Sequence, residues 1–332
     1  MINFVKHRKW YYLLSTLVIG AGIIAMVIST QTYPERSVVR LSIDFVGGTL
    51  FEVTFTPIEG QTPGEITGSA LEQLFAEAGL SDITAQRLGL TDNLRWQVRA
   101  SFIGEVSELV GDLSERLEAF AAERNVGFDE AFFNENLAAV SPIVGQEVTN
   151  AAVVATAVAS LLVLSWIAFA FRMVKHSWRY GICALLAMVH DVLVMAGAMS
   201  ILGLLVGWQA DALFLTGLLT IVGFSVQDTI VVFDRIREND VRRRGEPYEL
   251  IVNRSLLETI QRSLMTQVAV LFVLVSLFLV GSGPIHQFVG ILAIGLISGS
   301  YSSIFIAVPL LVSWDRGEFP FFIRRRQNRV AA

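Results

Sequence analysis

The side chains best suited to chemistry lie in the stretch TIVGFSVQDTIVVFDRIREN, residues 220–239. Asp228 comes six residues before Asp234 in this apolar run, which places its carboxylate ~9 Å inside the charged end of a helix that rises ~1.5 Å per residue. Burial opposes the ionised form of such a group and a nearby cation favours it, so its protonation can depend on what approaches it. Asp228 is therefore the first candidate for binding and releasing a proton.

A candidate cation lies in the following apolar segment. Arg262 and Thr266 are four residues apart and share one face of a predicted helix. That helix runs antiparallel to the one that carries Asp228, so its first turn is expected near the depth of the carboxylate. The structural alternative to proton handling is a static ion pair between Asp228 and Arg262 that only holds the two helices together.

A second polar pair, His190 and Asp191, lies about midway along another apolar run. A histidine titrates near neutrality and could relay protons, but it could equally form a packing hydrogen bond to a neighbouring helix. Asp191 is the stronger candidate of the two, because an unpaired carboxylate at that depth is hard to tolerate. Gln227, beside Asp228, is a further candidate through its amide.

The composition indicates an integral membrane protein. Hydrophobic residues make up 53% of the 332 residues, charged residues 17%, and the mean hydropathy is +0.58. Cys183 is the only cysteine, so neither a disulfide nor a cysteine-based metal site is expected. Runs of ~20 apolar residues can cross a ~30 Å hydrocarbon layer. Six runs qualify and predict transmembrane helices at about 10–30, 150–171, 180–204, 211–233, 264–281 and 286–314.

The distribution of basic residues predicts the orientation. Outside residues 31–149 there are 18 Lys or Arg, and they cluster at the N-terminus, at 172–179, at 235–262 and after 315. By the positive-inside rule these segments are cytoplasmic. We expect a cytoplasmic N-terminus and retained first span over 1–30, a helical bundle over 150–314 with a cytoplasmic loop at 234–263, and a basic cytoplasmic tail at 315–332.

Residues 31–149 are predicted to form an acidic extracytoplasmic domain, since they hold 19 acidic and 7 basic residues. The runs VVRLSIDFV and TLFEVTFTP read as strands that flank a hairpin turn at Gly47 and Gly48. Further strands are expected at ITAQRLGL, LRWQVRASF and 138–144, and helices at 62–79 and 105–124. Two helices on one face of a small antiparallel sheet predict an α+β, ferredoxin-like domain.

The segment PYELIVNRSLLETI, residues 247–260, has helical apolar spacing and is expected to lie along the membrane surface before the fifth span. The basic runs at 242–244 and 324–326 lie beside predicted spans. Contact with anionic lipids is therefore the expected role of these runs, and nucleic acid is not an expected partner.

Several motifs together resemble the SecF family. GFSVQDTIVVFDRIREN resembles the family's fourth-span signature, commonly GYSxNDTxVxFDRIREN, which begins at Gly223 here. This sequence departs from the family at Gln227, where Asn is usual, at Phe224, where Tyr is usual, and at Ser141, where Gly is common. The agreement continues in DFVGGT at 44–49, AMVHDV at 187–192, LLETIQRSLMT at 256–266 and GLISGSYSSIFIAVPLL at 295–311.

The resemblance implies a subunit of the SecD–SecF accessory to the bacterial Sec translocon, within the resistance-nodulation-division (RND) superfamily. It implies that Asp228, Arg262 and Thr266 handle protons, that H⁺ is the coupling ion with Na⁺ as an alternative, and that there is no other cofactor. The implied partners are SecD, the SecYEG translocon, YajC, YidC and exported unfolded polypeptide, at the inner membrane.

Two other functions remain open from the sequence. The chain could be an RND-superfamily exporter of lipids or small molecules, or a translocon scaffold that transports nothing. An enzyme is not expected, because the sequence contains no HExxH, GxSG or GxGD signature.

Overall fold

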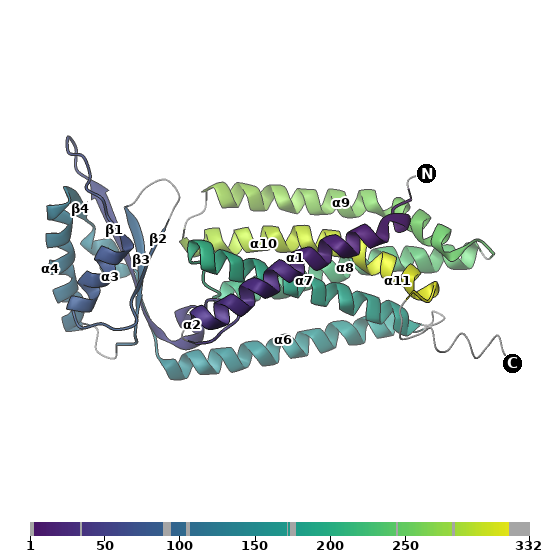
Figure 1. The fold of residues 1–332 in the computed structure, drawn as a ribbon, viewed down its shortest axis with the longest axis horizontal. Coiled ribbons are helices and arrows are strands. Elements are labelled where there is room, and N and C mark those ends of the chain that lie inside the picture. Colours follow the sequence, from purple (N-terminus) through teal and green to yellow (C-terminus); the bar gives the residue numbers. More distant parts are fainter. Residues whose placement is uncertain are drawn as a thin grey trace.

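The computed structural model of the chain describes residues 3–33, 35–88, 94–103, 107–170, 172, 177–243, 245–280 and 283–318. A small α+β domain lies at one end of a long helical bundle (Figure 1). We call this the domain end of the bundle. The first helix begins, and the last described helix ends, at the opposite end, which we call the terminal end.

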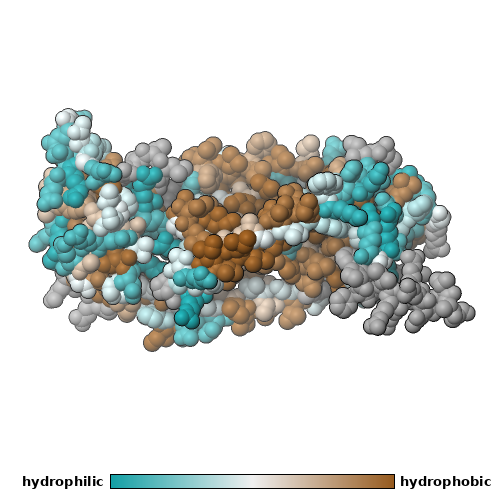
Figure 2. Space-filling view, viewed as in Figure 1, coloured by the Kyte–Doolittle hydropathy of each residue, from teal (hydrophilic) through white to brown (hydrophobic). Residues whose placement is uncertain are grey.

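Six helical segments in the described part of the chain are long and apolar enough to cross a membrane, as the sequence predicts. On the face shown in Figure 2, a hydrophobic band crosses the middle of the bundle, with hydrophilic surface beyond it at both ends. The last segment is interrupted by a short π-helix. The segments are α1 (Arg8–Thr32) after the short η1 (Val5–His7), α6 (Pro142–Ala170), α7 (Ser177–Val206), α8 (Ala212–Arg242), α9 (Tyr248–Val280), and α10 (Gly283–Ser302) continued by η2 (Ser303–Ala307) and α11 (Val308–Asp315).

The helices differ in how much of their surface this chain covers. Half or more of the apolar part of α7, α8 and the last span is buried, whereas α6 and α9 leave most of theirs exposed. The last span packs on α7, α8 and α9. The central helices therefore build the interior, and α6 and α9 offer apolar surface to lipid or to another protein.

Two glycines, Gly22 and Gly197, allow α1 and α7 to cross in close contact. A Cβ added at Gly22 would lie 2.9 Å from the Gly197 Cα, and one at Gly197 would lie 2.7 Å from the Gly22 Cα. Further toward the domain end, the Ser29 hydroxyl of α1 and the Ser200 hydroxyl of α7 form a buried hydrogen bond of 2.8 Å. Small residues let membrane helices approach this closely, so α1 is fixed to the core of the bundle.

The α+β domain has one antiparallel sheet in the order β2-β3-β1-β4, with β5 also paired to β1. Phe51, Val53 and Phe55 of β1 are buried and pack against α3 and α4, so these helices cover one face of the sheet. The elements are β1 (Gly48–Pro57), α3 (Gly68–Glu77), β2 (Thr84–Arg87), β3 (Arg95–Ala100), α4 (Ser107–Glu123), β4 (Val126–Phe128), α5 (Glu130–Glu135) and β5 (Leu137–Val140).

The predicted hairpin around Gly47 and Gly48 is wrong. Residues before the glycines form a short helix, α2 (Ile43–Val46), which is capped by Ser42 and ends when the Gly47 N–H bonds the Ile43 carbonyl. Gly47 has φ +78°, and an added Cβ there would lie 2.7 Å from the Pro142 Cα. Close contact with the start of α6 therefore explains this glycine, and β1 finds its partners in β3, β4 and β5.

Two further expectations need correction. Residues 247–260 do not form a separate surface helix, because α9 runs without interruption from Tyr248 to Val280 and buries Leu256 against the bundle. The strand β4 and the helix α5 have no counterpart among the predicted elements. The predicted basic tail lies mostly in residues 319–332, outside the described part of the chain.

The domain is bonded directly to the loop between α7 and α8. Leu41 and Ala210 form a parallel β-bridge, flanked by the hydrogen bonds Ser42 N to Ala210 O and Ala210 N to Arg40 O, of 2.8 and 2.7 Å. The Asp44 carboxylate accepts from the Ala212 N–H at 3.0 Å, at the first residue of α8. These contacts, which we call the domain junction, attach the base of the domain to the beginning of α8.

A second carboxylate, that of Asp211, also caps the beginning of α8. Asp211 accepts from the Phe214 N–H at 2.7 Å, and burial raises the pKa of Asp211, with the nearby Asp44 carboxylate acting in the same direction. Carboxylates at a helix N-terminus satisfy free N–H groups and complement the helix dipole. The beginning of α8 is therefore held at two points.

We predict that Gly22→Ala lowers the stability of the chain by about 1–3 kcal/mol, because its methyl group would push α1 away from α7. Gly20→Ala on the same helix is the control, since nothing lies within 4 Å of a Cβ at that position. Thermal unfolding in detergent should separate the two variants. Equal melting temperatures would contradict close packing at this crossing.

Candidate functional site

Asp228 lies in the contact between α8 and α9. Its side chain is buried, with 8% of the residue exposed, and its Oδ2 accepts a short hydrogen bond from the Gln267 amide. Gln267 is buried to the same degree, at 7%. The carboxylate thus faces a neutral amide inside the bundle and is not directed at lipid.

The helices place these side chains by their periodicity. On α9 the buried polar residues recur every fourth position, so they form one stripe that faces α8. The stripe continues toward the terminal end, where the Asn239 amide of α8 donates to the Ser255 hydroxyl at 2.9 Å. The stripe consists of Ser255, Thr259, Ser263 and Gln267.

The structure does not bring the three predicted proton-handling residues together. Arg262 and Thr266 are exposed on α9, and the Thr266 hydroxyl donates to the Arg262 carbonyl of its own helix at 2.9 Å. Among the described residues, no carboxylate forms an ion pair with Arg262. The expected pair with Asp228 is therefore not present within this chain, and the roles of Arg262 and Thr266 stay predictions.

Gln267, and not the expected Arg262, is the partner of Asp228 in this chain. Its Nε2 donates to Asp228, while its Oε1 is buried and has no hydrogen-bond partner in the described part of the chain. An amide can donate to an ionised carboxylate and accept from a protonated one. Gln267 can thus bond Asp228 in both charge states. The four-residue repeat of polar side chains on α9 is the sequence signal that could have revealed it.

Two other residues singled out in the fourth-span motif lie on the outside of this chain. Gln227 and Gly223 are exposed, and a Cβ added at Gly223 would meet nothing within 4 Å. Neither residue contributes to the Asp228 contact. Their exposure leaves this face of α8 free to meet a neighbouring protein.

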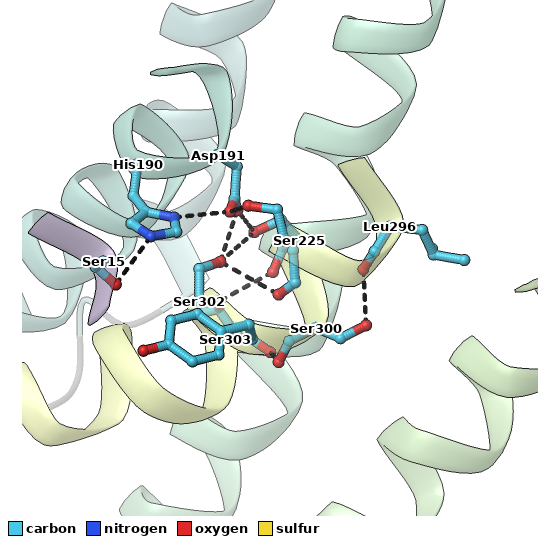
Figure 3. Close-up of polar contacts among 12 residues, drawn as sticks. Ser15, His190, Asp191, Ser225, Leu296, Ser300, Ser302 and Ser303 are labelled. Atoms are coloured by element: carbon cyan, nitrogen blue, oxygen red, sulfur yellow. Dashed lines mark hydrogen bonds and ion pairs between the residues drawn. The ribbon is translucent and has the colours of Figure 1, made fainter. Parts of the chain in front are cut away.

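The second candidate, Asp191, is fully buried at the centre of a hydrogen-bonded cluster (Figure 3). Its Oδ2 accepts from the Ser225 and Ser302 hydroxyls at 2.5 and 2.6 Å. Its Oδ1 accepts from the Ser298 hydroxyl at 2.8 Å and lies 3.1 Å from the His190 Nδ1. The cluster therefore joins α7, α8 and α10 around one carboxylate.

His190 extends the cluster to a fourth helix. Its Nε2 lies 3.1 Å from the Ser15 hydroxyl on α1 (Figure 3). Its ring also stacks against Tyr301, with centroids 6.1 Å apart. The predicted polar pair is thus a real contact. Among the described residues, no group of three or more His, Cys, Asp or Glu side chains could hold a metal ion.

Comparisons with known proteins agree on one family. The family model described as protein export membrane protein SecD/SecF, C-terminal, matches residues 121–317. Protein translocase subunit SecF of Thermobaculum terrenum is 44% identical over 338 residues, with both chains covered in full. Protein translocase subunit SecF of Anaerolinea thermophila is 39% identical over 333 residues, again across the whole of both chains.

A solved structure shows the same arrangement. The crystal structure of SecDF, a translocon-associated membrane protein from Thermus thermophilus, matches 95% of this chain with a TM-score of 0.73 and 26% identity. The match covers 39% of that longer chain. With its six apolar helices, its small sheet and full-length relatives named SecF, this multi-pass membrane protein belongs to the SecD/SecF family of protein-export membrane proteins.

Proposed function

We propose that this chain is a SecF-type accessory of Sec-dependent protein export, in which protonation of Asp228 is coupled to movement of the α+β domain. The domain lies outside the cytoplasm and assists the late translocation of unfolded polypeptide. Both termini are cytoplasmic, in keeping with the basic residues at the terminal end, and the membrane is the bacterial inner membrane. H⁺ is the coupling ion, with Na⁺ as the alternative tested below.

The observation that carries this proposal is the buried, unpaired charge of Asp228. A carboxylate held in a membrane span by a neutral amide has no fixed countercharge in the described part of this chain. Ionisable residues in such places are costly and mark ion pathways. Because Gln267 can bond either form of the carboxyl group, the site favours a change of protonation state without a large rearrangement.

The domain junction supplies the mechanical link. It ties the segment before β1 to the residues before α8, and α8 carries Asp228 at its middle. The Gln86 amide at the edge of the sheet also donates to the Val206 carbonyl at the end of α7, at 2.8 Å. A shift of α8 that follows a change of charge would therefore move the base of the domain directly.

A partner is expected on the exposed face of α8. Thr216, Thr220, Gly223 and Gln227 follow one another at helical spacing and are all exposed. Such small and weakly polar residues favour contact between membrane helices. The SecDF structure, of which this chain matches 39%, supports SecD as the protein that covers this face. In that assembly Arg262 and Thr266 would meet groups that SecD supplies.

The domain fold agrees with a role in handling polypeptide. The element order β1-α3-β2-β3-α4-β4 and the strand order β2-β3-β1-β4 support a ferredoxin-like domain. Its interior is filled by aromatic side chains, among them Phe51, Phe75 and Phe133, whose rings contact one another. We include SecYEG, YajC, YidC and anionic lipids at the basic terminal end among the proposed partners.

The available energy limits the mechanism. One proton that crosses ~100 mV releases ~2.3 kcal/mol, apart from any pH difference. That is enough to shift the domain between two states of similar free energy. It is too little to unfold a stable substrate, so each cycle must act on polypeptide that is already unfolded.

We predict that Asp228→Asn abolishes the gradient-dependent part of protein export in inverted vesicles that contain SecD and the translocon, because the amide cannot carry a proton. Asp234→Asn is the matched control, since Asp234 is exposed on the same helix and pairs with Arg237 at 2.6 Å. Imposing either an H⁺ or a Na⁺ gradient identifies the ion. Full gradient-dependent export by Asp228→Asn would refute the proposal.

We predict that Gln267→Leu raises the pH at which export is half-maximal. A hydrogen bond to a charged group contributes about 1.5–3 kcal/mol and one to a neutral group about 0.5–1.5 kcal/mol, so losing both leaves the ionised form less favourable by about 1–1.5 kcal/mol, or about one pH unit at 1.36 kcal/mol each. Gln261→Leu makes the same change at an exposed position of α9 and should leave the profile unchanged. Superimposable pH profiles for the parent chain and Gln267→Leu would exclude Gln267 from the proton site.

A further inference from the structure

The Asp191 cluster has no part in the mechanism proposed above, yet it holds two titratable side chains at the centre of the bundle. Asp191 is 0% exposed, and its only ion-pair partner in the described part of the chain is His190. Four donors point at its two oxygens (Figure 3). Burying a carboxylate is costly even when it is well bonded, and a neutral side chain could join the same helices more cheaply.

The spacing of the cluster decides which cation it can take. Its hydroxyl-to-carboxylate distances are 2.5, 2.6 and 2.8 Å. Oxygen ligands of a hard metal cation such as Ca²⁺ stand about 2.3–2.6 Å from the ion, and so lie further than that from one another. The oxygens of this cluster stand at the distances of direct hydrogen bonds, within which a proton fits.

The backbone beside the cluster is also irregular. The π-helix η2 (Ser303–Ala307) begins directly after Ser302, one of the three hydroxyl donors. At the end of α10 the Ser302 hydroxyl also approaches the Gly299 carbonyl at 3.2 Å, so it has a second acceptor when it turns from the carboxylate. Short π-helical segments are frequent at functional sites. The donors around Asp191 can therefore adjust to a change in its charge.

Protonation of this pair would change a hydrogen bond to α1. Neutral His190 with Nδ1–H directed at Asp191 accepts from the Ser15 hydroxyl through Nε2. When a proton is added to the ring, Nε2 becomes a donor and the Ser15 hydroxyl must accept instead. The added proton therefore reverses one hydrogen bond to α1, the helix that leads into the segment before the domain.

The cluster also lies close to the first site along α8. Ser225 precedes Asp228 by three residues, or ~4.5 Å along the helix axis. Tyr301 of α10 stacks on His190, and the nearest titratable side chains along the other helices are Tyr11 and Tyr12, about one turn before Ser15 on α1, and Cys183, two turns before His190 on α7. Asp228 is thus the acidic neighbour that a titration must separate from this cluster.

We propose that His190 and Asp191 form a second, buried proton-binding site, joined to α8 through Ser225 one helical turn before Asp228, whose occupancy is passed to α1 through Ser15. The pair gains one proton and later releases that same proton, with no other chemical change. This inference rests on the proposed function only for the first site at Asp228.

The test is proton uptake by the purified full-length chain in liposomes, measured across the range of about pH 5–8 in which histidine titrates. All measurements use an Asp228→Asn background, in which the first site cannot bind a proton. We expect Asp191→Asn to take up about one proton fewer per chain, and His190→Gln, whose amide can retain both hydrogen bonds, to give the same loss. Ser300→Ala is the matched control, since the Ser300 hydroxyl on the same helix α10 donates to the Leu296 carbonyl of its own helix and the change leaves both titratable groups in place.

Equal proton uptake by the Asp228→Asn background and by its Asp191→Asn and His190→Gln variants would show that the cluster only holds the helices together. Ser15→Ala should keep the uptake but reduce export several-fold in otherwise unchanged protein, whereas a Ser15→Ala chain with full export would remove the link to α1. Uptake in the Asp228→Asn background does not depend on export, so this inference and the proposed function can fail separately.

Discussion

The structure depends on a carboxylate that is buried between two membrane helices without a fixed countercharge in the described part of the chain. The Gln267 amide donates a hydrogen bond to Asp228. A permanent negative charge in that place would be strongly unfavourable, so the group must either be neutral or meet a cation from elsewhere. The polar stripe of α9 provides the amide that meets Asp228, and Arg262 is exposed on another face of the same helix.

α8 connects the parts of the molecule that such a change of charge would have to reach. Its beginning is bonded to the domain through Asp44 and Ala212, and its middle carries both Asp228 and Ser225. Ser225 in turn contacts Asp191, whose cluster includes α1 through His190. Because a helix resists bending over this length, a displacement at the middle of α8 is transmitted to the domain junction. In the proposed mechanism the same helix is therefore both the ion site and the mechanical link.

The sequence was sufficient to predict the membrane class, the six spans, the small sheet and the burial of Asp228 and Asp191. These features depend on local hydrophobicity and on the cost of charge in lipid, which a single chain displays directly. It was not sufficient to choose between Arg262 and Gln267 as the partner of Asp228. That choice depends on the rotation of α9 about its own axis, and here a five-residue difference in sequence changes the face on which a side chain lies.

Other errors arose where distant segments decide local structure. The residues before Gly47 carry β-branched and aromatic side chains typical of a strand, but contact with the start of α6 favours the short helix α2. The bridge between Leu41 and Ala210 joins segments far apart in the chain and leaves no local pattern. Likewise α9 continues through residues 248–260 because its buried face packs on α8 beyond the apolar run.

The most direct measurement of the central claim is the distance between the domain and the bundle as a function of Asp228 charge. Spin labels at Glu59 in the domain and Leu205 at the end of α7, both exposed, would report that distance by pulsed electron resonance. We expect the distance distribution of the parent chain with SecD to shift when the pH changes, and that of Asp228→Asn to stay in one state. A pH-dependent shift of equal size in both proteins would contradict the account.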